Sequence, residues 1–219
     1  LLMIITLSIF KGLFSFNFIA LPTADLYEIK SEYDVSILDE SPKSKLVKYG
    51  YELFQNTPSY IGPNIYDSAK IFSGNNLACS NCHLWAGTKP FSASLVGVVN
   101  RFPQYRSREH KLGTIKERIN GCMERSMNGR MMPLDSYEMK ALVGYLKWIG
   151  RNAPEEGEVF GQGFMKINLP YRAVNLENGR EIYKVQCVLC HGSKGEGIKE
   201  MESNSYVYPP LWGPDSYNN

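Results

Sequence analysis

The chain has 219 residues, of which 43% are hydrophobic and 21% are charged, and its formal net charge is +2. These values exclude a disordered tail and a membrane protein with several spans. Because basic and acidic residues nearly balance, we expect no binding to nucleic acid. The five cysteines are the most informative part of the composition.

The chain begins with two apolar stretches, residues 1–10 and 12–21, separated by one lysine. A signal peptide ending near Ala20 or Ala24 fits this pattern best, so residues 1–24 are predicted to be an export signal. The alternative is a retained membrane anchor, because about 20 apolar residues span a bilayer. Both interpretations place the rest of the chain outside the cytosol, in the periplasm. Membrane contact is expected only if the leader is not cleaved.

Four of the five cysteines form two copies of the motif Cys-x-x-Cys-His. The copies consist of Cys79, Cys82 and His83, and of Cys187, Cys190 and His191. This is the attachment signature of c-type haem, in which both thiols form thioethers with the porphyrin and the histidine binds the iron. A zinc ribbon needs its cysteine pairs about 15 to 20 residues apart, whereas these start 108 residues apart. We therefore predict two covalently attached haem c groups.

The spacing of the two motifs approximates the length of one small cytochrome domain. We therefore predict two tandem cytochrome c domains, residues 25–150 and 164–219, joined by a proline- and glutamate-rich linker over residues 151–163. No strand pattern rises above noise, so the predicted fold class is all-α. The last residues have loop composition and include no closing helix, so we expect the second domain to be truncated.

The segments before the two motifs resemble each other. Tyr183 lies four residues before the second motif and Gly179 four residues before Tyr183, which predicts a helix with both on one face. Gly50 and Phe54 repeat this pair before the first motif, but 21 additional residues follow Phe54. Prolines, glycines and asparagines are frequent in this insertion, so it is predicted to be a loop.

Two helices are predicted between the motifs. Thr114 begins a helix that runs to Met127, and Asp135 begins one that runs to Trp148, because each is followed three residues later by glutamate, as in a capping box. Gly150 is predicted to end the second helix. That helix carries an apolar stripe made of Met139, Leu142, Val143, Leu146 and Ile149.

The fifth cysteine, Cys122, falls inside the first of these helices. Arg118, Arg125 and Ser126 follow helical spacing from it and share its face. Residues 101–130 hold eight basic residues against three acidic ones. Such a patch favours the thiolate form of a cysteine and captures small oxyanions. The alternatives are a small buried core residue and a basic face that binds haem propionates.

Several segments of the chain match one known family. They read ACSNCHLWAGTKPF, RFPQYRSRE, INGCMERSMNGRMMP, DSYEMKALVGYLKW, NGREIYKVQCVLCHG and YPPLWGPDSYN. With this set the chain resembles the dihaem cytochrome c thiosulfate dehydrogenases over nearly all of its length after the leader. The Cys-x-x-Cys-His motif alone is unspecific, whereas the segment around the fifth cysteine is specific.

The resemblance implies that the first haem is bound by His83 and by the thiolate of Cys122. It implies the oxidative coupling of two thiosulfates to tetrathionate, a reaction that also runs in reverse. Arg108, Arg118 and Ser126 would then bind the anions and act beside that haem. The second haem would pass electrons to a small soluble cytochrome.

Two other functions stay open. Met132 precedes a proline and a helix, 49 residues after His83, which is where ordinary His/Met cytochromes place their methionine ligand. If Met132 binds the iron, the chain is a dihaem electron carrier without catalytic activity. The third possibility is a haem subunit of a sulfur-oxidising complex.

The surroundings of the second haem are less defined. Its candidate distal ligands are weak, and we expect the true ligand beyond residue 219; the candidates are Lys194, Lys199 and Met201. The run Pro209-Pro210-Leu211-Trp212-Gly213 resembles the cytochrome c loop whose proline carbonyl accepts the N–H of the haem-binding histidine. Pro90 is the corresponding candidate for His83.

Overall fold

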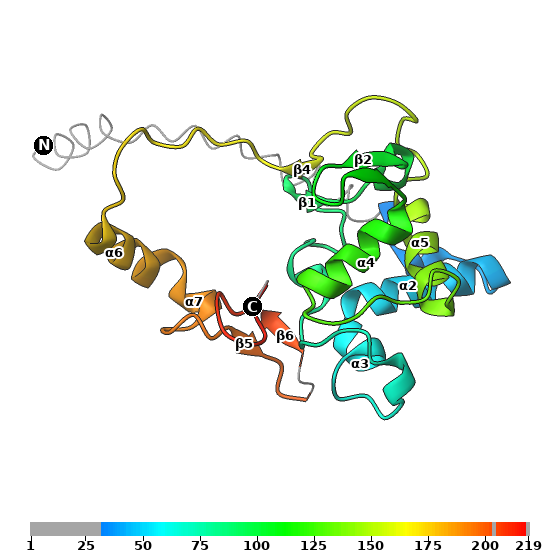
Figure 1. The fold of residues 1–219 in the computed structure, drawn as a ribbon, viewed down its shortest axis with the longest axis horizontal. Coiled ribbons are helices and arrows are strands. Elements are labelled where there is room, and N and C mark those ends of the chain that lie inside the picture. Colours follow the sequence, from blue (N-terminus) through cyan, green and yellow to red (C-terminus); the bar gives the residue numbers. More distant parts are fainter. Residues whose placement is uncertain (1–31, 203–204, 218–219) are drawn as a thin grey trace, which may run out of the picture. The chain divides into compact units, whose positions relative to one another are not determined.

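The computed structural model describes residues 32–202 and 205–217, whose elements are drawn in Figure 1. The α-helices are α2 (Pro42–Gln55), α3 (Thr57–Ile61), α4 (Ile115–Arg125), α5 (Tyr137–Ile149), α6 (Leu176–Gln186) and α7 (Val188–His191). The short 3-10 helices are η2 (Val35–Ile37), η3 (Ser68–Lys70), η4 (Cys79–Asn81) and η5 (Val98–Arg101). The strands are β1 (Ser92–Ser94), β2 (Gln104–Arg106), β3 (Lys111–Gly113), β4 (Gly163–Phe164), β5 (Ile198–Lys199) and β6 (Tyr206–Tyr208).

Antiparallel strand pairs within the described residues correct the prediction of an all-α chain. β1 pairs with β4, β2 with β3 and β5 with β6, and each strand has only two or three residues. Strands this short show no alternating hydrophobic pattern, so periodicity does not detect them. The regular structure is mainly helical, and the small sheets add to it (Figure 1).

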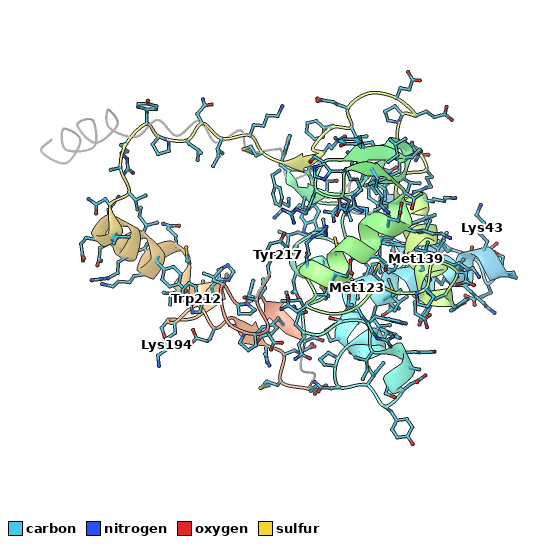
Figure 2. The ribbon with its side chains drawn as sticks, viewed as in Figure 1. Lys43, Met123, Met139, Lys194, Trp212 and Tyr217 are labelled. Carbon is cyan, nitrogen blue, oxygen red and sulfur yellow. The ribbon has the colours of Figure 1, made fainter. Side chains whose placement is uncertain are left out.

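The core lies where α2 packs against α5. Gly50 on α2 permits the contact, because a Cβ atom there would overlap the carbonyl oxygen of Ala141 and lie 2.8 Å from Cβ of Tyr145. The hydroxyl of Tyr145 donates a hydrogen bond of 2.7 Å to the carbonyl of Ala86, just after the first motif. The predicted stripe on α5 is buried, which confirms that part of the prediction. Met123 of α4 and Met139 of α5, labelled in Figure 2, belong to the same core.

The helix starts were predicted with mixed success. Thr114 caps α4, and the reciprocal hydrogen bonds with Glu117 form the predicted capping box. In α5 the capping residue is Ser136, whose side chain accepts from the N–H of Met139, and not Asp135. Aspartate and serine side chains both accept hydrogen bonds at helix starts, so the sequence pattern does not distinguish Asp135 from Ser136 as the capping residue. Gly150 ends α5 as predicted.

The insertion before the first motif is predicted to be a loop, but it is partly helical. It contains α3 and η3. Pro58 stands in the first turn of α3, where a proline removes no helical hydrogen bond, so its presence did not argue against a helix. Pro58 is therefore compatible with the start of a helix at this position.

We expect Gly50→Ala to lower the free energy of unfolding by about 2–3 kcal/mol, because the new methyl group forces α2 and α5 apart. Gly144→Ala on α5 is the matched control. A Cβ there meets only side-chain atoms of Leu46, at 3.6 Å or more, so this change should raise stability by about 0.5–1 kcal/mol through helix propensity. Denaturant unfolding of the purified holoprotein measures both, and equal effects would contradict the packing argument.

The segment 151–163, predicted as a linker, hydrogen-bonds to the chain around β1 and η5. The N–H of Phe91 donates to the carbonyl of Gly161 at 2.7 Å, and Asn100 donates through Nδ2 to the carbonyl of Pro154 at 3.1 Å. The predicted domain limits stay a prediction.

The predicted leader, residues 1–24, lies outside the described residues. Over residues 32–202 and 205–217, none of the helices has both the length and the apolar character needed to cross a bilayer.

Candidate haem and anion site

The first Cys-x-x-Cys-His motif is held by hydrogen bonds on both sides. Thr57, which is fully buried, accepts from the N–H of Cys79 at 3.1 Å and donates to the carbonyl of Leu53 at 2.8 Å. Nδ1 of His83 lies 2.7 Å from the carbonyl oxygen of Ala93. Because a carbonyl only accepts, Nδ1 carries the proton and Nε2 keeps its lone pair for a metal.

The partner of His83 corrects one expectation. Pro90 was the expected acceptor, but the carbonyl of Ala93, three residues later, takes this place. Sequence spacing from a histidine to a loop carbonyl depends on how tightly the loop turns, and no side chain marks the carbonyl that faces the ring. The chemical role of the contact is the one expected; the residue is different.

The second motif has the predicted support. α6 leads into α7, which carries His191, and Nδ1 of His191 lies 2.9 Å from the carbonyl of Pro209. The hydroxyl of Tyr183 donates to the carbonyl of Gly192 at 2.7 Å. These contacts confirm the helix before the motif and the proline carbonyl after it.

The candidate distal ligands of the second motif gain no support from their surroundings. Met201 is fully exposed. Lys199 forms an ion pair of 3.4 Å with Asp215. The backbone N–H of Lys194 donates to Glu196.

The fifth cysteine interacts electrostatically with the thiols of the first motif. The pKa of the Cys79 thiol is raised to about 12, mainly by burial and to a smaller extent by the charge of Cys122. The pKa of the Cys82 thiol is raised by the same two causes. Cys122 therefore lies close enough to both motif sulfurs for its charge to act on them.

Arg118 connects this cysteine to the first motif. Its Nη1 donates to the sulfur of Cys122 at 3.0 Å, one helical turn away on α4. Burial lowers the pKa of His83, and the charge of Arg118 lowers it further, whereas the hydrogen bond to Ala93 opposes the change. A neutral imidazole is the form that binds iron. The cysteine, the guanidinium and the motif histidine thus share one site.

The other two predicted site residues are placed differently. Ser126 is half-buried at the end of α4, and its carbonyl accepts from Nδ2 of Asn75 at 3.0 Å. Arg108 is exposed in the turn between β2 and β3. Within the described residues, no hydrogen bond joins Arg108 to Cys122.

Met132, the rival ligand, is fully buried and close to α4. Its N–H donates to Oδ1 of Asn120 at 2.9 Å and its carbonyl accepts from Nδ2 of the same residue at 2.9 Å. Asn120 thus ties the backbone of Met132 to the helix two residues before Cys122. The side chain of Met132 belongs to the hydrophobic core.

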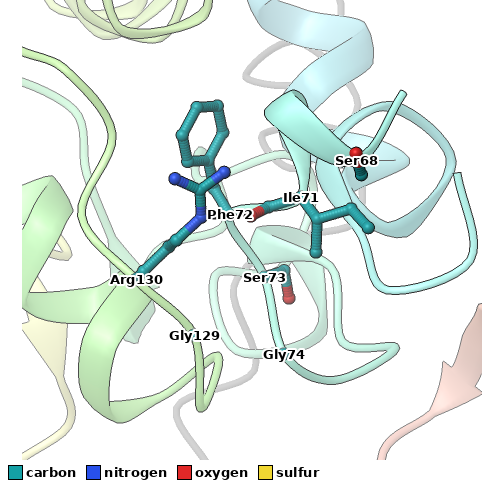
Figure 3. A pocket seen from close by; sticks show the side chains of 7 residues that line it. All are labelled: Ser68, Ile71, Phe72, Ser73, Gly74, Gly129 and Arg130. Carbon is teal, nitrogen blue, oxygen red and sulfur yellow. Dashed lines mark hydrogen bonds between the residues drawn. The ribbon is translucent and has the colours of Figure 1, made fainter.

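Arg130, one of the eight basic residues in the segment 101–130, has a structural role. Arg130 lines a shallow surface cavity with Phe72, over whose ring its guanidinium lies at 4.8 Å (Figure 3). Its Nε and Nη2 donate to the carbonyls of Ile71 and Ala69 at 2.7 and 2.8 Å. Arg130 therefore fixes the chain before the first motif, and the basic run 101–130 is not one uniform patch.

The residues of the first motif fit a covalently bound haem. Two thiols, a neutral imidazole and the ring of Phe54, 6.1 Å from that of His83, provide the attachment points, a metal ligand and an apolar wall. Nη1 of Arg101 is buried without a hydrogen-bond partner in the described part of the chain. A buried donor without a partner is costly, and a haem propionate would satisfy it.

Comparison with known proteins shows which proteins the chain is similar to. Residues 65–154 match the model of the SoxA/TsdA cytochrome c domain. Thiosulfate dehydrogenase of Thiomonas intermedia is 36% identical over 183 residues, which cover 84% of this chain and 55% of that protein. That of Stutzerimonas stutzeri is 37% identical over 174 residues, 80% of this chain and 53% of that protein.

A solved structure gives the same result. Thiosulfate dehydrogenase (TsdBA) from Marichromatium purpuratum superposes with a TM-score of 0.75 and 29% identity, over 90% of this chain and 42% of that chain. The chain spans about half the length of the curated relatives it matches. A cytochrome c domain carries covalently bound haem c, and the site described above has the groups to hold it. Residues 65–154 thus belong to the SoxA/TsdA cytochrome c domain family, and the chain is similar to thiosulfate dehydrogenases over most of its length.

Proposed function

We propose that this chain is an exported, periplasmic enzyme that couples two thiosulfates to tetrathionate and passes two electrons to a small soluble cytochrome. The observation that carries the proposal is the hydrogen bond from Arg118 to Cys122 next to the first Cys-x-x-Cys-His motif. An ordinary electron carrier has no use for a half-buried thiol with its own guanidinium donor.

The proposal includes two haem c groups in two cytochrome c domains, 25–150 and 164–219. The first is attached through Cys79 and Cys82, with His83 and Cys122 as iron ligands. The second is attached through Cys187 and Cys190, with His191 as iron ligand. The equivalent hydrogen bonds of the two histidines to backbone carbonyls support this assignment.

The residues around Cys122 account for the binding of two like-charged substrates. Thiosulfate is a small dianion, and holding two of them together requires positive charge. Arg118 and Arg108 supply guanidinium groups, which donate paired hydrogen bonds to oxyanions. Ser126, one turn after Cys122, adds a hydroxyl donor. Positioning and electrostatic stabilisation both lower the barrier to coupling.

The covalent step uses the sulfur of Cys122. Its thiolate and the terminal sulfur of one thiosulfate form an S–S bond and release two electrons, leaving a cysteine S-thiosulfonate. A second thiosulfate attacks the bridging sulfur of this adduct, a new S–S bond forms, and the cysteine leaves as thiolate with its original charge. The product is tetrathionate. When bound, the haem groups supply one-electron acceptors for the two electrons.

The test is an assay of the purified holoprotein with thiosulfate and ferricyanide and with no other protein. We expect one tetrathionate formed and two ferricyanides reduced for every two thiosulfates consumed, and two haems per chain by the pyridine haemochrome method. A protein with two haems that does not oxidise thiosulfate would contradict the proposed activity and leave a carrier or a subunit of a complex.

A further inference from the structure

Two arginines, Arg106 and Arg125, come together beside Gly121, the residue before Cys122. Arg106 comes from β2 and Arg125 from the last turn of α4, three residues after the cysteine. The side chain of Arg106 is only 9% exposed. A buried guanidinium needs a partner, since an unpaired buried charge is strongly destabilising.

One carboxylate oxygen supplies that partner for both arginines. Oε1 of Glu109 accepts from Nη2 of Arg106 at 2.7 Å and from Nη1 of Arg125 at 3.2 Å. Glu109 lies in the turn of the β2–β3 hairpin, next to Arg108. Its carboxylate therefore joins the hairpin turn to the helix that carries Cys122.

Two buried glycines make room for this arrangement. A Cβ atom on Gly113 of β3 would lie 2.5 Å from Cδ of Arg106. A Cβ atom on Gly121 of α4 would lie 2.9 Å from Nη2 of Arg106 and 2.6 Å from Nη2 of Arg125. The guanidinium groups thus lie directly on the helix backbone at the residue before Cys122, and side chains at these glycines would displace them.

We propose that Glu109 is a positioning residue of the anion site. It fixes Arg125 over Gly121 and holds the hairpin turn, with Arg108, against α4. We call Glu109 with Arg106 and Arg125 the clamp. The inference rests on the proposed function, because the clamp is assigned the task of orienting guanidinium groups toward a sulfur oxyanion beside Cys122. A carboxylate in a cluster of cations weakens anion binding if it does nothing else. The Glu109 carboxylate also holds the positive charges of Arg106 and Arg125 together.

The ion pair between Lys111 and Glu117 provides a matched control. Nζ of Lys111 on β3 lies 2.7 Å from Oε1 of Glu117 on α4, so it also joins the hairpin to the helix. The lysine is more than half exposed, and exposed pairs contribute little. Lys111→Met removes this contact without touching Glu109.

The experiment compares the wild type with Glu109→Gln, Glu109→Asp and Lys111→Met as holoproteins. We expect Glu109→Gln to raise KM for thiosulfate about tenfold, which corresponds to one charged hydrogen bond, with kcat and the haem spectrum nearly unchanged. Glu109→Asp keeps the charge and should recover part of the loss. Lys111→Met should change KM by less than about twofold.

Hydrogen exchange of the backbone provides a second readout that does not depend on turnover. Amides of residues 104–113 should exchange faster in Glu109→Gln than in the wild type, with no change in α5. Unchanged KM and exchange, or a loss of activity that follows a lowered melting temperature and an altered haem spectrum, would overturn the proposal. If the wild type itself does not oxidise thiosulfate, the proposed function fails, and exchange in residues 104–113 alone decides whether the clamp exists.

Discussion

Replacing Cys122 by glycine is expected to reduce tetrathionate formation by three orders of magnitude or more, roughly the loss seen when a covalent nucleophile is removed. Both haems should stay attached, because Cys79 and Cys82 lie in another segment and the hydrogen bond between Cys79 and Thr57 does not involve α4. Tetrathionate production and haem content per chain measure the two effects.

Met132→Leu is the control for this variant. Leucine nearly conserves the volume of the methionine, so the core around it is preserved. If Cys122 is the ligand, Met132→Leu keeps its activity and Cys122→Gly does not. The reverse pattern would assign the iron to Met132 and contradict the mechanism.

Arg118→Leu is expected to lower kcat/KM for thiosulfate by about a hundredfold. The reason is the loss of a charged donor 3.0 Å from the sulfur that forms the new bond. Arg118→Lys keeps the charge but loses the forked geometry, so it should recover only part of the activity. Steady-state kinetics with thiosulfate as the varied substrate measures both.

A charge change elsewhere on α4 serves as the comparison. Nζ of Lys116 donates to the carbonyl of Leu134 at 2.8 Å, so Lys116→Met removes one positive charge from the same helix without touching the cysteine. Equal losses for Arg118→Leu and Lys116→Met would show that only the total charge matters. We expect a large loss of kcat/KM for Arg118→Leu and a small one for Lys116→Met.

The parts of the fold that the sequence predicts are those marked by side chains. Thr114 and Glu117 predict the start of α4, and Gly150 predicts the end of α5. The apolar stripe of α5 predicts which face of that helix is buried. The loop after the second motif was found because two consecutive prolines mark the carbonyl that contacts His191.

The parts that the sequence does not predict depend on backbone groups and on distant contacts. The acceptor for His83 is a carbonyl of Ala93, which no side chain distinguishes from its neighbours. The β2–β3 hairpin is too short for a periodic pattern, and it carries Glu109 to two arginines, one of them 16 residues away. Such a cluster exists only after folding. Composition therefore showed a basic run, but it did not show that Arg106 and Arg125 share Glu109 or that Arg130 bonds to backbone carbonyls.

The most direct test is the electron paramagnetic resonance spectrum of the oxidised holoprotein, recorded for the wild type, Cys122→Gly and Met132→Leu. The account predicts a low-spin signal of histidine–thiolate ligation in the wild type and in Met132→Leu, and its loss in Cys122→Gly. A wild-type spectrum of histidine–thioether ligation that disappears in Met132→Leu and persists in Cys122→Gly would contradict it.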